Sequence, residues 1–494
     1  MPRRVVAFIA LVSACCLLLA LPVARASEVS HARIVRLSYT AGDVQSRIAI
    51  TYPWQKAPVN TPLREGMELA TGDGRAEVEF ESSGIAWMAS NTVMELPQLV
   101  LEDGSKLTLL NVKQGTATFY VKPGKNDSFA VQAGALQIHP PGNARFRVDV
   151  FDDGASVSVF HGTVDVDLND AVYHLNSKRT LAFRNDSISN AELQSNPSRD
   201  GWDHWVSDRD TAVEAARFNT SNYVGAPFGY GMADLSFYGG WVNLPGYGYG
   251  WQPWGVGGGW TPFYNGCWTS FGAFGPTWVS YEPWGWVPYH YGGWVFSPIY
   301  GWVWAPGNFG IWNPATVAFV QTPAGVGWVP RGPREPVSST PMNLSHGLVT
   351  NTPEGMLARA QNTIQRGATP GSVQLVSDWR SNAALARFSQ QAPTGGQAAV
   401  QAAPSGVHPA QRMPPGPVPR NTNAGMLAGS TPRYHAPSIF HSSSHASHSS
   451  SGFSASPGSP AMSGGARSAS PGTGTGSAGG RGGSGSSGGA HGKP

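Results

Sequence analysis

The chain has 494 residues, of which 62 are glycine and 40 are proline, and its formal net charge is +3. Charged residues make up only 13% of the chain, and beyond the amino terminus no run reaches the roughly 18 apolar residues that a membrane-spanning helix needs. Two of the three cysteines lie within the first 16 residues, so Cys267 is left alone, which excludes a disulfide framework and a cysteine-based zinc site.

Residues 1–26 have the pattern of an export signal peptide. Two arginines precede an apolar stretch over residues 5–21, and Ala24-Arg25-Ala26 fits a small-residue cleavage site. We therefore expect a periplasmic or secreted bacterial protein. The run Val12-Ser13-Ala14-Cys15 resembles a lipobox, but cleavage there leaves an apolar new terminus, so a lipoprotein is the less favoured alternative.

The charge of the remaining chain is divided between two regions of opposite sign. Residues 27–330 carry 18 basic and 27 acidic side chains, whereas residues 331–494 carry 12 basic and 3 acidic ones. An acidic body is thus followed by a basic tail, which we expect to contact anionic surfaces without specificity.

Residues 30–190 consist of short segments in which apolar and polar residues alternate, separated by turn sequences. The segment 145–151 alternates strictly and is followed by Asp152-Asp153-Gly154, a strong hairpin signal, after which residues 156–160 return as a second strand. Alternation over many such segments predicts an antiparallel all-β sandwich, barrel or roll.

Two stretches of this region resemble a known domain. Residues 61–80, beginning Thr61-Pro62-Leu63-Arg64, are similar to the opening of a FecR-type periplasmic domain, and residues 145–166 are similar to its end. The resemblance implies an all-β module outside the cytoplasmic membrane, best known in regulators of iron-siderophore uptake. This sequence departs from those regulators because it has no anti-sigma helical region and no transmembrane helix, so the signalling role does not follow.

Residues 200–220 have apolar residues at helical spacing and predict a connector helix. Residues 234–335 then form a module rich in Trp, Gly and Pro, in which the pattern Trp-x-Pro-x5-Trp begins at Trp260, Trp286 and Trp304. We interpret it as a self-packing β repeat in which Trp-x-Pro ends a strand. This order is similar to an uncharacterised family of secreted bacterial proteins in which a FecR-like domain precedes aromatic repeats.

The region after the aromatic repeats loses its apolar content in two stages. Residues 336–392 predict a linker with two short helices, over residues 352–366 and 378–390. Residues 393–494 are dominated by Pro, Ser, Gly and His, and such a composition predicts a disordered tail. The fold class that we expect is therefore mainly β: a FecR-like domain, a Trp-rich β-repeat module and a disordered tail.

Motifs that carry catalytic or metal-binding chemistry are missing from the sequence. There is no phosphate-binding loop, no His-Glu-x-x-His and no Cys-x-x-Cys, so we expect no enzyme activity, no catalytic residue and no cofactor. The run from Asp165 to Asp170 lacks the glycine and the closing glutamate of a calcium loop, and we interpret it as a strand entering an Asn-Asp hairpin. We predict no metal site.

The tryptophans of residues 234–335 allow two interpretations. They either form an aromatic core, since each indole buries roughly 150–250 Å², or they lie exposed and stack on sugar rings. For any single tryptophan we favour the core. The aromatic residues that we single out as possible ligand contacts are Trp260, Trp268, Trp286, Tyr289, His290, Tyr291, Trp294, Trp304 and Trp312.

The function that these observations favour is that of an exported envelope protein acting as an interaction or scaffold module. One alternative is a module that binds a cell-wall glycan or an exopolysaccharide. A second is a FecR-like sensory partner of an outer-membrane receptor that lacks the anti-sigma segment. The partner is thus an unknown envelope protein or glycan. Residues 218–330 contain no Lys or Arg, which argues against specific nucleic-acid binding, because phosphates need cations.

Overall fold

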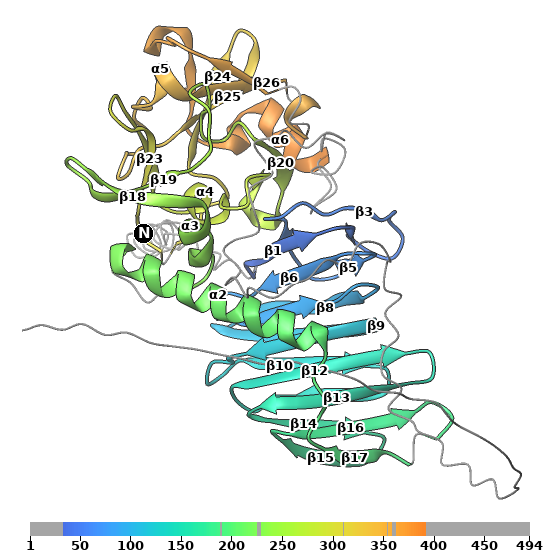
Figure 1. Cartoon of the computed structure of the whole chain (residues 1–494). Helices are drawn as coiled ribbons and strands as arrows, with labels where there is room; N and C mark the ends of the chain where they lie inside the picture. The colour runs from blue at the N-terminus through green and yellow to red at the C-terminus, as the bar shows by residue number, and fades with distance from the viewer. Residues whose placement is uncertain are drawn as a thin grey trace, which may run out of the picture. The chain divides into compact units, whose positions relative to one another are not determined.

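A computed structural model describes residues 33–391, except for 188–189, 225–228, 310, 353 and 358–361. The predicted export signal over residues 1–26 and the predicted disordered tail over 393–494 lie outside the described residues. The described chain is mainly β, as expected, and Figure 1 shows a long series of strands followed by an irregular region of short strands and helices. None of the described helices has the length and apolar character needed to cross a membrane.

Seventeen strands, which we call the β stack, join into one continuous structure with two faces. Strand β9 (Ser105–Val121) belongs to both faces: its first part pairs with β8 and β10, and its second part pairs with β7 and β12. Gly115 lies between the two parts with a φ of 88°, and a Cβ atom there would meet the carbonyl oxygen of Asn91 at 2.5 Å. Glycine is therefore required where β9 passes from one face to the other.

The chain alternates between the two faces as it proceeds, and nearly all neighbouring strands are antiparallel, the pair β9 and β10 being parallel. One face contains β2 (Val44–Arg47), β3 (Gln55–Lys56), β5 (Glu68–Thr71), β8 (Val93–Glu102), β10 (Ser128–Ala133), β11 (Leu136–His139), β14 (Thr163–Leu168) and β15 (Ala171–Asn176). The other contains β1 (Val35–Ala41), β4 (Pro62–Leu63), β6 (Arg75–Glu79), β7 (Ile85–Met88), β12 (Ala144–Phe151), β13 (Gly154–His161), β16 (Arg179–Arg184) and β17 (Glu192–Ser195).

An aliphatic core fills the space between the two faces. Because successive side chains of a strand point to opposite sides, the apolar half of each alternating segment turns inward. Val112, Phe146, Val148 and Val166 are examples, each with no exposed surface. The predicted hairpins also form: β12 pairs with β13 across Asp152 and Asp153, and β14 pairs with β15 across an Asn-Asp turn.

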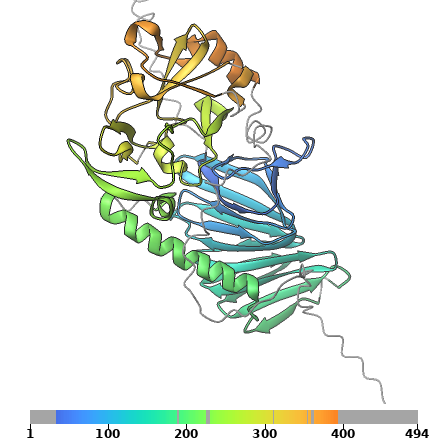
Figure 2. The same cartoon turned by 45° about the horizontal axis from the view of Figure 1, so that its top comes forward.

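Helix α2 (Gly201–Val224) covers the outer side of the face that contains β6 and β12. Its buried residues follow helical spacing, and Trp202, Val206 and Val213 pack against Ile85 and Trp87 of β7. Figures 1 and 2 show the helix running across several strands of the stack. The helix begins after Asp200, whose side chain accepts hydrogen bonds from the backbone N–H groups of residues 202 and 203, as a capping residue does.

The remaining described chain, residues 232–391, is called here the aromatic module and contains three small sheets. Their strand orders are β18-β19-β23-β22, β20-β21 and β27-β26-β25-β24-β28. The strands are β18 (Gly239–Leu244), β19 (Gly248–Pro253), β20 (Gly266–Ser270), β21 (Pro276–Ser280), β22 (Gly293–Ser297), β23 (Gly301–Ala305), β24 (Val317–Thr322), β25 (Gly325–Pro330), β26 (Leu348–Asn351), β27 (Thr363–Gln365) and β28 (Gln374–Val376). The helices are α3 (Met232–Tyr238), α4 (Trp286–His290), α5 (Leu344–Gly347) and α6 (Ala383–Gln391), with 3-10 turns η1 (Gly272–Phe274), η2 (Glu354–Leu357), η4 (Pro370–Ser372) and η5 (Trp379–Ser381).

Residues 336–391 differ from the linker that the sequence predicted. They supply β26, β27 and β28, which complete the sheet around β24 and β25, and Leu385 and Phe388 of α6 enter the aromatic core. The prediction of a helix over residues 352–366 is wrong for its last residues, because Thr363–Gln365 form β27. Pairing of this strand with β26 outweighs the weak local helix preference, because a helix this short gains little without packing.

The three Trp-x-Pro-x5-Trp copies do not form equivalent units. In the third copy Trp304 does end a strand, since β23 stops at Ala305 just before Pro306. In the second copy Trp286 instead begins α4, which accommodates Pro288 in its first turn, where proline is tolerated. Trp260 of the first copy lies in a turn. The common spacing therefore reflects repeated composition and not a repeated fold.

Candidate functional site

Most of the aromatic residues singled out from the sequence lie in one continuous core. Seven of the nine are buried, whereas Trp260 and Trp312 are half-buried at its margin. Edge-on ring contacts are frequent, for example between Trp260 and Trp294 at 5.6 Å and between Trp268 and Trp328 at 5.3 Å. The buried seven are Trp268, Trp286, Tyr289, His290, Tyr291, Trp294 and Trp304.

Some indole N–H groups of this core cross-link segments that do not pair as strands, whereas those of Trp268, Trp278, Trp286, Trp302 and Trp312 have no hydrogen-bond partner among the described residues. Trp294 donates to the carbonyl of Pro288 at 2.9 Å, Trp304 to that of Tyr291 at 2.7 Å, and Trp328 to that of Phe263 at 2.9 Å. Such bonds satisfy carbonyls that short strands and turns leave without a ladder partner. These indoles are structural, which is the role that we favoured for any single tryptophan.

Two polar residues of the aromatic module, Glu282 and His290, are also occupied within its core. Glu282 is buried, accepts a hydrogen bond from Nε1 of Trp260 at 2.6 Å, and accepts another from the Tyr289 hydroxyl. His290 is stacked on Trp312, with ring centroids 4.8 Å apart, and its Nδ1 donates to the carbonyl of Asn313 at 2.7 Å. Burial lowers the pKa of His290 to about 3, so the imidazole is neutral and serves the core.

Cys267 is a buried thiol on β20, packed with Val279 and close to Tyr281. Burial raises its pKa to about 12, although Tyr281 opposes the shift. A thiol held in this way is inert toward oxidants and metals at neutral pH, because the thiolate is the reactive form.

A buried charge network connects the β stack to the aromatic module. Arg36 of β1 is 2% exposed, and its guanidinium lies 2.6 Å from Oε2 of Glu79 on β6 and 2.8 Å from Oδ2 of Asp234 on α3. Arg217 of α2 donates to the other oxygen of Glu79 at 2.6 Å. Two arginines and two carboxylates, from four different elements, therefore meet in one place.

Asn60 extends the network into the Trp-rich sequence. Its Oδ1 accepts a hydrogen bond from Arg36 at 3.1 Å, and its Nδ2 donates to the backbone carbonyl of Glu282 at 2.8 Å. Tyr230 contributes a further link, since its hydroxyl donates to the carbonyl of Ile34 at 2.7 Å. We call this set, with Arg36, Glu79, Asp234 and Arg217, the junction network.

The two carboxylates of the junction network respond to burial in different ways. Burial alone raises the pKa of Glu79, but Arg36, Arg217 and the backbone N–H of Gly231 outweigh it, so this pKa lies below its ordinary value. Burial also raises the pKa of Asp234, and here the effect dominates, giving a value of about 6 in spite of Arg36. Oδ2 of Asp234 makes the ion pair without a well-directed hydrogen bond, which leaves this carboxylate the less stabilised of the two.

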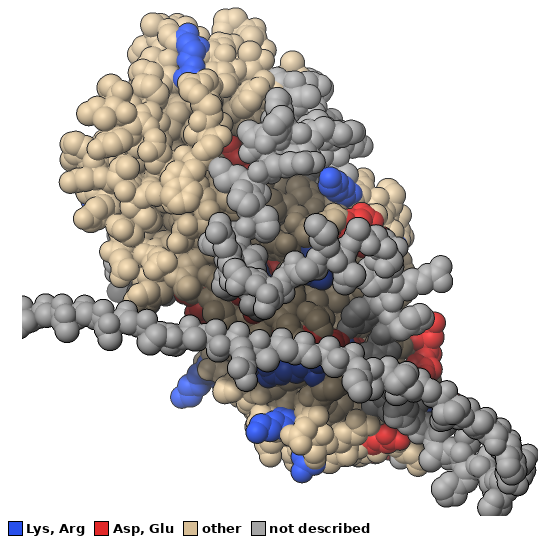
Figure 3. Space-filling model, viewed as in Figure 1, with Lys and Arg blue, Asp and Glu red and all other residues tan. Residues whose placement is uncertain are grey.

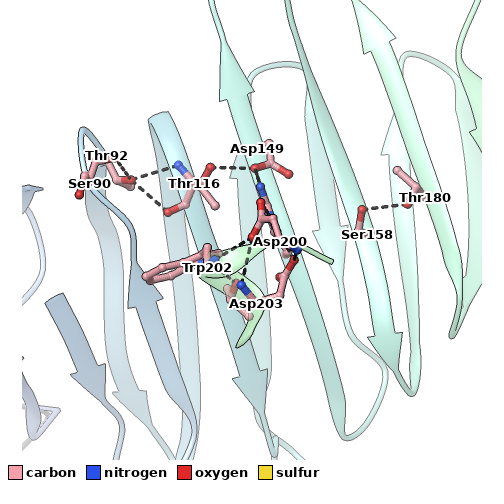
Figure 4. A network of polar contacts seen from close by, with 11 residues as sticks. Ser90, Thr92, Thr116, Asp149, Ser158, Thr180, Asp200, Trp202 and Asp203 are labelled. Carbon is pink, nitrogen blue, oxygen red and sulfur yellow. Dashed lines mark hydrogen bonds and ion pairs between the residues drawn. The ribbon is translucent and has the colours of Figure 1, made fainter. Parts of the chain in front are cut away.

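Further ion pairs hold α2 on the β stack. Asp203 lies 3.0 Å from Arg147 of β12, Asp210 pairs with Arg145, and Arg209 lies 2.9 Å from Glu77 of β6. Figure 4 shows Asp200, Trp202 and Asp203 inserted among the polar side chains of this face. Trp202 donates its indole N–H to Oγ1 of Thr118 at 3.0 Å. Arg145, Arg147 and Glu77 on the outward side of the strands are thus paired and covered by α2.

One group of aromatic rings lies exposed, and the sequence did not single it out. Tyr223, at the end of α2, stacks on Trp241 of β18 with ring centroids 4.8 Å apart and an angle of 7° between the planes. Tyr249 of β19 meets Tyr223 edge-on at 5.2 Å. Together with Asn243, which is exposed, these residues form what we call the aromatic ledge. The alternation Gly246-Tyr247-Gly248-Tyr249-Gly250 was the available signal, because glycines flanking tyrosines leave little to bury them.

The surface around the aromatic ledge is almost free of charge. Asp234 and Glu282 are the acidic residues between positions 218 and 330, both are buried, and Lys and Arg do not occur in that range. Figure 3 shows the contrast on the face in view, where the aromatic module is largely uncharged and the β stack carries side chains of both signs. Among the described residues no group of His, Cys, Asp and Glu has an arrangement suited to a metal ion.

Comparisons with known proteins agree with this division. Residues 67–165 match the family model described as FecR protein, and residues 232–335 match that of a family of unknown function, DUF6600. The chain therefore carries a FecR domain followed by a DUF6600 region, and both resemblances expected from the sequence are confirmed. No curated protein matches the chain significantly.

Two similar solved structures are crystal structures of a proposed anti-sigma factor from Parabacteroides distasonis ATCC 8503. The first, at 1.65 Å resolution, is 23% identical, covers 28% of this chain and 64% of that chain, and gives a TM-score of 0.24. The second, at 2.50 Å, is 18% identical, covers 31% of this chain and 72% of that chain, and gives a TM-score of 0.25. Scores this low carry no argument about function.

Proposed function

We propose that this protein is an exported, non-enzymatic envelope protein that acts as an interaction scaffold, with its FecR domain and aromatic module fixed as one body. The junction network is the observation that carries the proposal. Separation of the β stack from the aromatic module would break the ion pair of Arg36 with Asp234 and the hydrogen bond of Asn60 to Glu282, and would expose the Trp286 ring that packs near Arg36. Surfaces on both parts are therefore presented in one geometry.

The absence of an enzyme role is supported by how the ionisable groups are used. Glu282 and His290, the ionisable residues at the centre of the aromatic module, are buried and hydrogen-bonded within the core. Glu77, Glu79 and Asp234 are paired with arginines under α2 and α3. In a scaffold, buried ionisable side chains of this kind add rigidity, and none of them has to be accessible to a ligand.

The proposal is tested in the native host with the full chain and a photo-crosslinkable residue on the exposed side of the β stack. The wild-type chain is expected in the envelope fraction, with a mass that shows cleavage after Ala26, and with a reproducible set of crosslinked envelope proteins. In Arg36→Met, the chain remains exported but the crosslinked set changes. Retention in the cytoplasm, or crosslinks that stay the same in a variant shown to be loosened by proteolysis, would overturn the proposal.

A second candidate is a sensory partner of an outer-membrane receptor, favoured by the FecR match over residues 67–165. Deletion of the gene then alters transcription of receptor genes when the transported ligand is supplied. Unchanged transcription under both ligand-replete and ligand-starved growth contradicts this candidate and leaves the scaffold proposal standing.

A further inference from the structure

The aromatic ledge presents ring faces that the fold does not use. Tyr223 and Tyr249 are 40% and 56% exposed, although each ring has an aromatic neighbour within 5.2 Å. The rings are therefore held in place while much of their surface remains in water. Rigid aromatic side chains with a polar tip are well suited to binding, since little conformational entropy is lost when a ligand covers them.

The pairing of β18 with β19 places an amide beside the rings. Trp241 is opposite Trp251, and Asn243 is opposite Tyr249, so Trp241, Asn243 and Tyr249 share one side of the hairpin. The exposed Asn243 amide both donates and accepts hydrogen bonds. Exposed ring surfaces with a neighbouring amide suit a molecule that has an apolar face and hydroxyl groups at its rim.

The hairpin turn makes the tyrosines project. Gly246 and Gly248 both have a φ of 83°, a conformation that favours glycine, and nothing lies within 4 Å of the position of a Cβ atom at either residue. The turn is therefore open on both sides. Figures 1 and 2 show the hairpin of β18 and β19 extending outward from the rest of the aromatic module.

The lack of charge limits the ligand class. An anionic polymer requires cations for its phosphates or carboxylates, and residues 218–330 contain no Lys or Arg. A cationic ligand gains from carboxylates, and the two acidic residues of this range are buried in the core. A neutral ligand can bind such a surface without burying a charge that has no partner of opposite sign.

From this geometry we infer that the aromatic ledge binds a neutral glycan chain, with sugar rings stacked on Tyr223 and Tyr249 and hydroxyl or acetamido groups bonded to Asn243. The inference deepens the proposed scaffold role by naming one partner, and it rests on that role in requiring an exported protein. The shared chemistry is an uncharged pyranose polymer. Cell-wall backbones and exopolysaccharides are its two sources.

The experiment is calorimetric titration of the purified full chain with three oligosaccharides of equal length. Chitohexaose represents an N-acetylated wall backbone, cellohexaose represents a neutral exopolysaccharide, and hexagalacturonate is the anionic control. Binding of either neutral probe without binding of hexagalacturonate is expected, and the preferred neutral probe identifies the source.

Variants on the two sides of the hairpin assign the binding to the ledge. Tyr249→Ala is expected to weaken the preferred probe about tenfold, a loss of roughly 1.4 kcal/mol, and Asn243→Ala to weaken it less. Trp254→Ala is the matched control, since Trp254 is 54% exposed and packs over Gly240, on the opposite side of β18 from Trp241. It is expected to leave binding unchanged. Circular dichroism confirms that each variant is folded.

Three outcomes would overturn the inference. These are no heat with either neutral probe, equal binding of hexagalacturonate, and equal losses in Tyr249→Ala and Trp254→Ala. Sedimentation also distinguishes a further occupant: a dimer that Tyr249→Ala dissociates assigns the ledge to a second copy of the chain. Because these titrations use purified protein, a negative result leaves the crosslinking test of the scaffold role unaffected, and the reverse also holds.

Discussion

In the β stack the core side chains are mostly valine, leucine and alanine on strands paired along their length, whereas in the aromatic module tryptophan fills the core between short strands. The difference follows from what each backbone provides. Long paired strands bring many small side chains into register, and their ladders satisfy the backbone. Short strands cannot do this, so large rings supply the buried area, and some of their N–H groups, as in Trp294, Trp304 and Trp328, bond to backbone carbonyls outside the sheets.

The two regions also treat charge differently. The outward side of the β stack keeps arginines and carboxylates, which become buried only because α2 brings partners of opposite sign. The aromatic module avoids charge over residues 232–330, where the two acidic residues, Asp234 and Glu282, serve as buried acceptors. The stability of the β stack therefore depends on specific ion pairs at the face that α2 covers, whereas the stability of the aromatic module depends on the volume of its packed rings.

The largest expected effect is on thiol labelling, which reports on the aromatic module alone. Cys267 is fully buried, and its pKa is raised to about 12 by burial. A domain stable by at least about 5 kcal/mol should protect the thiol roughly 1,000-fold or more against a thiol reagent. Labelling is measured on a chain that starts at Ser27, in which Cys267 is the single cysteine, and is compared with the same chain unfolded in urea. Rapid labelling under native conditions would show that the module opens independently of the β stack.

Truncation of a core indole should cost more than truncation of an aliphatic core residue. Trp294→Ala is expected to destabilise the protein by about 3–5 kcal/mol, because it removes a buried ring and the bond to Pro288. Trp294→Phe, which removes the hydrogen bond and only part of the ring, should cost less, about 1–3 kcal/mol. Urea unfolding monitored by near-ultraviolet circular dichroism gives both values. A cost for Trp294→Ala below that of Leu110→Ala in the β stack contradicts the comparison.

Removal of the arginine at the centre of the junction network should loosen the connection of the two regions. Arg36→Met leaves Glu79 and Asp234 without their shared partner and is expected to cost about 3–5 kcal/mol. Arg184→Met is the control, since this arginine pairs with Asp153 and Asp186 at the surface and should cost at most about 1 kcal/mol. The free energy of unfolding is measured for both. Equal costs would show that the junction network adds no stability.

A smaller effect is expected from pH. Asp234 has a folded pKa of about 6, above its ordinary 3.8, so the folded state binds this proton more tightly. The corresponding stability is present below pH 3.8 and is lost as pH rises through 6, a decline of about 1–3 kcal/mol. The groups that influence this carboxyl are Arg36 on β1, Glu79 on β6, Arg209 on α2 and Tyr238 on α3.

The sign is opposite for Glu77, which lies outside the junction network but under the same helix. Its pKa is lowered to about 2, since Arg209, Ser38 and Trp87 outweigh burial, so its contribution is present above pH 4.5 and is lost as pH falls toward 2. Asp234→Asn should therefore abolish the decline between pH 4.5 and 7 and leave the acid limb in place. Chemical unfolding at several pH values tests this, and an unchanged decline in Asp234→Asn counts against it.

The β stack could be predicted from sequence to a large extent, and the reason is physical. Period-two alternation records which side of each strand is buried, and turn sequences such as Asp152-Asp153-Gly154 mark where strands reverse. The pairing of β9 with strands of both faces had no such local signal. It depends on Gly115 and on contacts between residues far apart in the chain.

The aromatic module was predicted in composition and not in structure. A tryptophan at a given spacing is compatible with a strand, a turn or a helix start, as Trp304, Trp260 and Trp286 demonstrate. Sequence alone also could not reveal that Arg36, which reads as one residue of a β strand, meets Asp234 nearly 200 positions later. The aromatic ledge was missed for the same reason, because Tyr223 and Trp241 come together only through tertiary structure.

The order of charges along α2 fixes both the position and the direction of the helix on the β stack. Acidic side chains at its start and middle lie over the arginines of β12, and arginines at its middle and end lie over the glutamates of β6. A slip of three residues would put Val206 and Val213 over those β12 arginines and leave them unpaired, and a reversed helix would oppose like charges. A hybrid protein in which the aromatic module is replaced by that of a related chain must therefore take α2, β6 and β12 from the same parent.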